Sequence, residues 1–314
     1  RAKGFLVDVI QAAVELGASD EDTVRWLDVS RNPMLHHAPL SVSGFLADAL
    51  FRNRTVVLTS ATLQVSGSME MTAQALGLVG THEWTSADVG SPFDFAQQGI
   101  LYCASHLPSP TAGGQSELML DELASLIDAA GGRTLSLFSS WRAVDQAAEH
   151  LSHSFTGRTD RPLLVAQPGQ PVAELINEFR ATPEATLLGT MALWQGIDVP
   201  GDTCTLVTID RIPFPRPDDP VMSARSDKAD EMGFGGFRTV ALPRAAILLA
   251  QGVGRLIRST QDRGVVAVLD SRLATARYGG VLRATLPALW WTTDGAAVCE
   301  SLQRLNEAAR ANTD

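Results

Sequence analysis

The stretch Gln251-Gly252-Val253-Gly254-Arg255-Leu256-Ile257-Arg258 carries the most information in this chain. It continues the apolar run at 245–250, and the pattern predicts one helix over residues 242–258. On such a helix the two arginines share one face, with Gln251 one turn before them. Guanidinium groups beside a buried apolar run are costly unless an anion meets them. Because the guanidinium fork matches phosphate oxygens, the octet predicts phosphate contact, as in the arginine fingers of enzymes that hydrolyse nucleoside triphosphates.

Length and composition set the class of protein. The chain has 314 residues, which is enough for about two domains. The net charge of −10 argues against binding nucleic acid through bulk basicity, although a narrow basic groove remains compatible with it. No apolar run reaches the ~18 residues of a transmembrane helix, so we expect a cytoplasmic protein with no membrane partner. Because Arg1 opens the chain, we also expect a piece of a longer protein or a processed product.

Cysteine and histidine usage predicts no metal site. Cys103, Cys204 and Cys299 are widely spaced and lack metal-ligand spacing, so we expect reduced thiols in a cytosolic setting. The adjacent His36 and His37 do not face one metal easily on regular structure.

Short apolar runs alternate with amphipathic helical patterns. This alternation predicts an α/β fold with a parallel sheet flanked by helices. The predicted strands are residues 25–29, 55–59, 99–104, 134–139, 163–166, 186–188, 205–209 and 265–270. The predicted helices are residues 6–16, 43–51, 115–130, 143–151, 172–180 and 242–258.

Four further segments place polar or aromatic residues after predicted strands. They are Thr59-Ser60-Ala61-Thr62-Leu63, Ser139-Ser140-Trp141-Arg142, Gly189-Thr190 continuing to Trp194-Gln195-Gly196-Ile197-Asp198, and Arg211-Ile212-Pro213-Phe214-Pro215. Ligands of open α/β sheets sit at such strand ends. Each segment also has a simpler interpretation: a Ser/Thr turn, a helix cap, a loop with a core tryptophan, or a rigid surface connection.

Taken together in this order, the segments resemble the motifs of a superfamily 2 helicase, and more closely the DinG branch of the XPD-like DNA helicases. The segment Thr59–Leu63 matches motif III, residues Leu137–Trp141 match motif IV, and the segment that begins at Gly189 matches motif V. The octet matches motif VI. The resemblance covers roughly residues 25–290 and implies a RecA-like, P-loop-NTPase-type fold for the helicase C-terminal domain. It places a remnant of the arch insertion and of helicase domain 1 in residues 1–65, and helicase domain 2 in residues 66–314.

The resemblance also implies roles for individual residues. Arg255, Arg258 and Gln251 would be catalytic at the γ-phosphate, and Gly196, Asp198 and Gly254 would line the nucleotide cleft. Thr59, Ser60 and Thr62 would couple hydrolysis to strand movement. The residues that would contact nucleic acid are Ser139, Ser140, Trp141, Arg142, Thr190, Arg211 and Phe214. One departure is Gln195, which stands where this family usually has a glutamate.

The sequence has no phosphate-binding Gly-x-x-x-x-Gly-Lys-Ser/Thr loop and no Asp-Glu-Ala-His segment for magnesium. The resemblance places both in an upstream helicase domain 1, which would hold most of the ATP and Mg²⁺. It also places any Fe–S cysteines upstream, since no four-cysteine set occurs here.

We therefore expect the C-terminal half of an ATP-dependent, 5′-to-3′ DNA helicase of repair or replication. It would be monomeric, bind single-stranded DNA and be inactive by itself. The alternatives are a non-catalytic nucleic-acid-binding module, an RNA helicase or a nuclease-fused relative.

Overall fold

In the computed structural model the described residues are 10–11, 13–14, 16–17, 20–29, 32–60, 62–64, 67–80, 83–111, 113–182, 184–190, 193 and 203–311. The chain divides into two compact units. Unit 1 comprises Arg1–Ala87 and Phe214–Arg244, and unit 2 comprises Asp88–Pro213 and Ala245–Asp314. The functional boundary expected at residue 65 stays a prediction.

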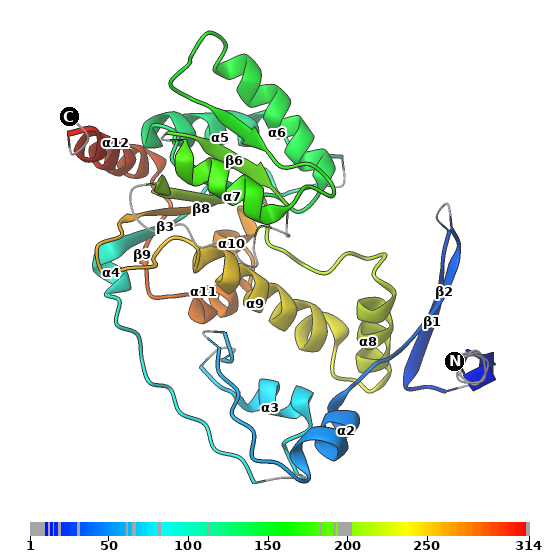
Figure 1. Ribbon diagram of the computed structural model, residues 1–314. Coiled ribbons are helices and arrows are strands. Elements are labelled where there is room, and N and C mark those ends of the chain that lie inside the picture. The colour runs from blue at the N-terminus through cyan, green and yellow to red at the C-terminus, as the bar shows by residue number, and fades with distance from the viewer. Residues whose placement is uncertain are drawn as a thin grey trace. The chain divides into compact units, whose positions relative to one another are not determined.

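Unit 2 is built on a parallel sheet (Figure 1). Its strands among the described residues are β3 (Gly99–Cys103), β4 (Thr134–Leu137), β5 (Leu163–Val165), β6 (Thr186–Gly189), β7 (Leu206–Ile209), β8 (Gly264–Val268) and β9 (Trp290–Thr292). Their order is β5-β6-β4-β7-β8-β3-β9, and every hydrogen-bonded pair is parallel. The parallel sheet predicted for this region is confirmed, although the short strand β9 was not expected from the sequence.

Both faces of this sheet are covered, which explains why its central strands are mostly apolar and buried at every position. One set of alternate strand residues, including Tyr102, Leu206 and Val265, joins a core cluster with three helices. These helices are α5 (Glu117–Ala130), α6 (Trp141–Ser154) and α12 (Gly295–Ala311). The other set, including Leu101 and Val207, is equally buried. The remaining helices of the unit are α4 (Phe95–Gln98), α7 (Val172–Ala181), α9 (Leu242–Val253, shared with unit 1), α10 (Arg272–Thr275) and α11 (Gly279–Thr285).

Unit 1 contains an antiparallel hairpin of β1 (Thr23–Asp28) and β2 (Met34–Pro39). The sequence predicted β1 but not β2, whose His36 stacks on Trp26 with ring centroids 4.8 Å apart. The hairpin is tied to α8 (Pro220–Glu231) by the Lys228–Asp22 ion pair. The other described elements of this unit are the short α-helices α2 (Ser43–Leu46) and α3 (Glu70–Leu76) and the π-helices η1 (Ala47–Phe51) and η4 (Phe237–Ala241).

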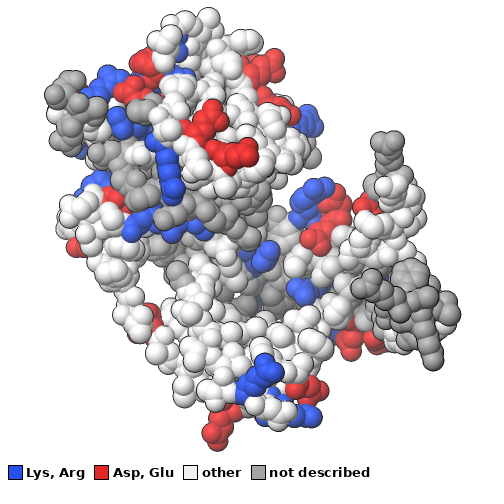
Figure 2. Space-filling model, in the orientation of Figure 1, with Lys and Arg blue, Asp and Glu red and all other residues white. Residues whose placement is uncertain are grey.

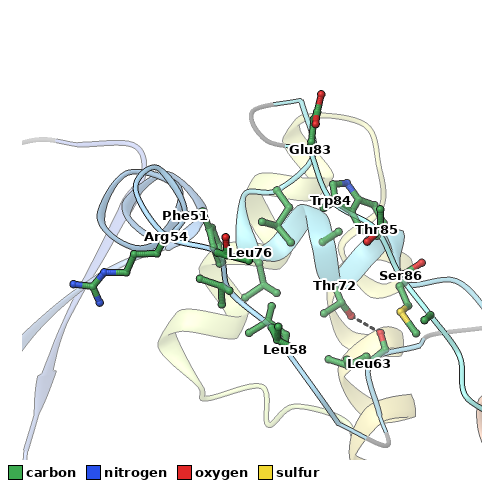
Figure 3. A pocket seen from close by; sticks show the side chains of 17 residues that line it. Phe51, Arg54, Leu58, Leu63, Thr72, Leu76, Glu83, Trp84, Thr85 and Ser86 are labelled. Atoms are coloured by element: carbon green, nitrogen blue, oxygen red, sulfur yellow. Dashed lines mark hydrogen bonds between the residues drawn. The ribbon is translucent and has the colours of Figure 1, made fainter.

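The strand predicted at residues 55–59 is wrong. This segment is extended but pairs with no strand among the described residues, and a β-strand requires a hydrogen-bonded neighbour. Val57 is 85% exposed, which is unusual for an apolar side chain in such a run. The segment lines a cavity of about 690 Å³ together with α3 and residues 83–87 (Figure 3). Thr72 donates a hydrogen bond to the Leu63 carbonyl at its edge, 2.7 Å away.

No helix among the described residues is long and apolar enough to cross a membrane.

Candidate nucleotide cleft and nucleic-acid surface

The Gln251–Arg258 octet is not one helix, which corrects the sequence prediction. Helix α9 ends at Val253, and Arg255 lies in a turn whose amide donates to the Gly252 carbonyl at 3.1 Å. The glycines at 252 and 254 have low helix propensity and explain the early end. The two arginines therefore do not share a helical face.

Buried apolar residues fix this loop between the two arginines. Leu256 and Ile257 are 2% and 5% exposed, whereas Arg255 and Arg258 are half-buried. The side chain of Leu256 packs over the first residues of β3 and β8. A Cβ built on Gly99 would lie 3.4 Å from Leu256 Cδ2, and one on Gly264 would lie 2.7 Å from Cδ1. Glycine at these positions makes room for the loop to lie against the sheet.

Asp262 fixes the backbone just after the second arginine. Its carboxylate accepts from the Arg258 amide at 2.6 Å and from the Ser259 amide at 2.8 Å. The Ser259 hydroxyl donates to the other carboxylate oxygen at 2.6 Å. The buried Gln98 amide nitrogen then donates to the carbonyls of Ser259 and Asp262. The Asp262 side chain thus holds the Arg258 backbone, and Gln98 holds the turn that follows it.

The side-chain oxygen of Gln251 is a buried acceptor at the C-terminal end of α9. This atom, Oε1, has no hydrogen-bond partner among the described residues. A buried polar atom without a partner is costly, and a water or a ligand donor at this point would satisfy it. Arg255 Nε donates to the Gln251 carbonyl at 3.2 Å, which places a cation at the C-terminal end of α9. Gly254 lies between them, and its amide donates to the Ala250 carbonyl. The structure thus brings Gln251, Gly254 and Arg255 together at the C-terminal end of α9.

A buried carboxylate organises the motif IV region at the carboxyl ends of β4 and β7. Asp210 is 2% exposed, and its Oδ1 accepts from the amides of Ser139 and Arg211 at 3.0 and 2.8 Å. Its Oδ2 accepts from the Ser139 hydroxyl at 2.9 Å and from Gln115 Nε2 at 2.8 Å. Burial raises the pKa of Asp210 above its ordinary value, and the Arg211 charge opposes that rise. These contacts bring motif IV and Arg211 together.

The arginines predicted to contact nucleic acid meet the loop that precedes α5. Arg142 Nη2 donates to the Gly113 carbonyl at 2.9 Å, and Arg211 Nη1 approaches the Thr111 carbonyl at 3.4 Å. Arg142 is exposed, and the Arg211 side chain is 23% exposed. Their guanidinium groups therefore lie at the same loop.

The neighbouring motif IV residues differ in environment. Ser140 is exposed and caps α6, its hydroxyl oxygen accepting from the Ala143 amide at 3.2 Å. Trp141 packs partly against the core cluster. Thr190, at the carboxyl end of β6, is 9% exposed.

The remaining predicted residues lie elsewhere. Thr59 and Ser60 are exposed in unit 1, where the Ser60 hydroxyl accepts from the Thr62 amide at 3.2 Å, as in a Ser/Thr turn. Phe214 also belongs to unit 1 and packs against Phe237, with ring centroids 5.5 Å apart. Gly196 and Asp198, with Gln195, fall outside the described residues.

Sequence reasoning missed Asp210, Asp262 and Gln115. Asp210 had a usable signal, because a charged residue directly after a mostly apolar strand is expected to have partners. Gln115 and Asp262 had none, since their partners lie 95 residues away in the first case and in a local turn in the second.

Charge is unevenly distributed over the surface. Figure 2 shows a run of Lys and Arg side chains on the face of unit 2 that is turned toward the viewer, despite the net charge of −10. Within the described residues, no group of three or more His, Cys, Asp or Glu side chains is placed to hold a metal ion.

Comparison with known proteins places this geometry in a family. The profile described as the helicase C-terminal domain matches residues 123–288, which is more than half of the 314 residues. The chain belongs to the helicase C-terminal domain family. The matched region includes motif IV, Asp210 and the motif VI loop.

Individual relatives agree with this assignment. The chain is 50% identical to the ATP-dependent helicase DinG of Mycobacterium tuberculosis over 92% of this chain and 44% of the relative. It is 35% identical to the ATP-dependent DNA helicase YoaA of Escherichia coli, over 84% of this chain and 41% of the relative. The chain therefore spans less than half the length of these curated relatives.

Solved structures confirm the fold. An XPD structure titled "XPD_APO" matches with a TM-score of 0.61 and 17% identity, over 86% of this chain and 55% of that one. A second, "XPD_Helicase", gives a TM-score of 0.57 at 16% identity, over 86% and 48%. The predicted RecA-like helicase C-terminal fold and the resemblance to the DinG and XPD-like helicases are thus confirmed.

Proposed function

We propose that this chain is the C-terminal half of an ATP-dependent DNA helicase that couples ATP hydrolysis to 5′-to-3′ translocation on single-stranded DNA, in repair or replication. The observation that carries the proposal is the motif VI loop. It holds two half-buried arginines on buried leucine and isoleucine anchors, beside a glutamine whose buried oxygen has no hydrogen-bond partner in the described part of the chain. The names of the relatives support the same activity.

In this proposal the chain contributes half of a nucleotide site. ATP with Mg²⁺ supplies the phosphoryl group and its charge neutralisation, and we place most of its binding groups in helicase domain 1. Arg255 and Arg258 stabilise the negative charge that develops on the terminal phosphate. Gln251 orients a water or a phosphate oxygen through its amide, and Gly254 allows close approach. Gly196 and Asp198 of motif V would line the same cleft.

The exposed segment at residues 55–58 supports a missing neighbour for unit 1. An extended, mostly exposed run that pairs with no strand of the described residues is the edge that a sheet from helicase domain 1 would pair with. Thr59, Ser60 and Thr62 follow that run directly, so in the assembled protein they would lie between strand and cleft and couple hydrolysis to movement. We also propose that the full-length protein is a cytoplasmic monomer. Its molar mass, measured by light scattering coupled to size-exclusion chromatography, would test the monomeric state.

The decisive experiment uses the full-length protein with Arg258→Ala. We expect ATPase activity to fall by about a hundredfold or more, with nucleotide affinity changed only a few-fold. Arg263→Ala is the matched control: this exposed arginine, five residues on, donates to the carbonyls of Thr260 and Asp262. Unchanged ATPase in Arg258→Ala would refute the finger role.

The 314-residue chain alone should show no DNA-stimulated ATPase, because it lacks the phosphate-binding loop. Measurable stimulated turnover by this chain would refute that expectation. If the full-length protein bound nucleic acid but had no ATPase, the non-catalytic binding module would be the better account. Stronger stimulation by RNA than by DNA would indicate an RNA helicase.

A second candidate function rests on one relative. The Bacillus subtilis protein named 3′-5′ exonuclease DinG is 34% identical over 86% of this chain, which covers 30% of that relative. A parent of that kind would carry a nuclease in its remaining length. Degradation of single-stranded DNA by the full-length protein without ATP would favour it.

A further inference from the structure

Asp210 is buried among residues that were predicted to contact nucleic acid. It directly follows β7, beside the carboxyl end of β4. Its carboxylate accepts four hydrogen bonds from three segments: one from the loop before α5, two from motif IV and one from its own neighbour Arg211. Because the carboxylate is 2% exposed and hydrogen-bonded on both oxygens, its orientation is fixed.

The contact with Ser139 limits what that serine can do. A hydroxyl has one proton to donate, and Ser139 donates it to Asp210 Oδ2 at 2.9 Å. Phosphate oxygens only accept hydrogen bonds, so Ser139 cannot donate to a phosphate while this bond exists. Ser140 differs, because its exposed hydroxyl accepts from the Ala143 amide and keeps its proton for another acceptor.

The contact with Arg211 orients a cation. Arg211 Nε forms an ion pair with Asp210 Oδ2 at 3.3 Å without hydrogen-bond geometry, and its Nη1 donates to the Thr111 carbonyl at 3.4 Å. The guanidinium is therefore held along one edge while its side chain remains 23% exposed. Gln115 completes this arrangement, since its side chain donates to Asp210 and its amide donates to Gln146 Oε1 at 3.2 Å.

We propose that Asp210 is a positioning residue of the single-stranded DNA surface: it holds Arg211 ready for a backbone phosphate and uses the Ser139 hydroxyl, so that Ser140 provides the hydroxyl contact to DNA. The inference rests on the proposed function, because it assumes that this surface binds a phosphodiester backbone. An arginine whose rotamers are already restricted loses less conformational freedom when it meets its phosphate. The partner is a phosphate group of any sequence, since no base-reading contact is involved.

The test measures binding of an oligothymidylate to the full-length protein by fluorescence anisotropy at several salt concentrations. We expect Asp210→Asn and Arg211→Gln each to weaken binding about tenfold. Each should also reduce the slope of log affinity against log salt by about 0.7, the value for one phosphate contact on a single strand. The DNA affinity of the double variant should lie within about twofold of that of the weaker-binding single variant, because both changes remove the same phosphate contact.

A control variant and a pair of serine variants separate a positioning role from simple destabilisation. Glu122→Gln is the matched control, since that 19%-exposed carboxylate in the same unit accepts from Tyr102 and touches no predicted DNA contact. It should leave the affinity and the salt slope unchanged. Ser140→Ala should weaken DNA binding and, because it also removes the cap of α6, should lower the melting temperature slightly. Ser139→Ala should lower the melting temperature while leaving the DNA affinity unchanged. If Asp210→Asn does not fold, Gln115→Ala removes one half-buried donor and should weaken binding about threefold.

Additive effects of Asp210→Asn and Arg211→Gln, or a wild-type salt slope in Asp210→Asn, would overturn the proposal. So would Gln115→Ala with unchanged DNA affinity, or loss of DNA binding in Glu122→Gln. Failure of the wild-type protein to bind oligothymidylate would instead refute the proposed function itself, so the two failures are distinguishable.

Discussion

Replacing Leu256 with alanine tests whether the motif VI loop is anchored as the structure shows. The leucine is 2% exposed, and its two methyl groups fill the space over Gly99 and Gly264. Buried Leu-to-Ala changes cost about 2–5 kcal/mol, with the larger values where the site cannot collapse. Here the floor is the start of two hydrogen-bonded strands that cannot move inward, so we expect about 3–4 kcal/mol.

This loss should lower the melting temperature by about 10 °C, using the sensitivity of domains of this size. The assay is urea unfolding of the 314-residue chain followed by circular dichroism, with calorimetry for the melting temperature. Leu118→Ala is the matched control: it is the same chemical change at a side chain that is 61% exposed, and it should cost less than about 0.5 kcal/mol.

The contrary outcome is a Leu256→Ala chain within about 1 kcal/mol of the wild type. That result would mean that Leu256 is not packed over the strand starts. Arg255 and Arg258 would then lack the anchor from which their placement was argued.

Three further outcomes are expected. Burial raises the pKa of Cys103 and of Cys204 to about 12, so at pH 8 about one thiol in ten thousand is ionised. Ellman's reagent should therefore label neither thiol until urea unfolds the chain. Rapid labelling of these two cysteines in the native chain would contradict their burial. Asp262→Ala leaves its backbone and hydroxyl donors without an acceptor and should lower the free energy of unfolding by about 2–3 kcal/mol, with urea unfolding as the measurement and no change as the refuting result. Tyr102→Phe removes only the 2.6 Å bond to Glu122 and should cost about 1–2 kcal/mol, less than Leu256→Ala; a larger loss would show that the ring also moves.

The central strands of the sheet could be predicted because their signal is local. Residues 134–137 and 206–209 are short runs without charged side chains that are buried at every position, as expected in a sheet covered by helices on both sides. The helices α5 and α6 carry their own start signals, since Ser116 and Ser140 cap them through side-chain oxygens. Edge strands gave weaker signals: β9 is three residues long, and its place in the sheet depends on pairing with β3.

The candidate site was predicted less completely. The residue types of motifs IV and VI could be read from the sequence, but their geometry could not. The apolar helix pattern continues through Ile257, whereas α9 ends at Val253. The low helix propensity of the two glycines and the packing of Leu256 against the strand starts outweigh that pattern. Residues 55–58 show the reverse case, where strand propensity is strong but no partner strand is present among the described residues.

The alternation of strands and helices, the order of the motifs and the prediction that two arginines meet an anion could all be obtained from the amino-acid sequence. Those properties depend on side-chain type and short-range periodicity. Long-range packing was needed to show that Arg255 and Arg258 lie on a loop anchored by Leu256, and that Gln115, Ser139 and Arg211 gather around the buried Asp210 carboxylate. The reason is that desolvation makes a buried carboxylate recruit donors from wherever the fold brings them, and Gln115 is 95 residues from Asp210 in sequence.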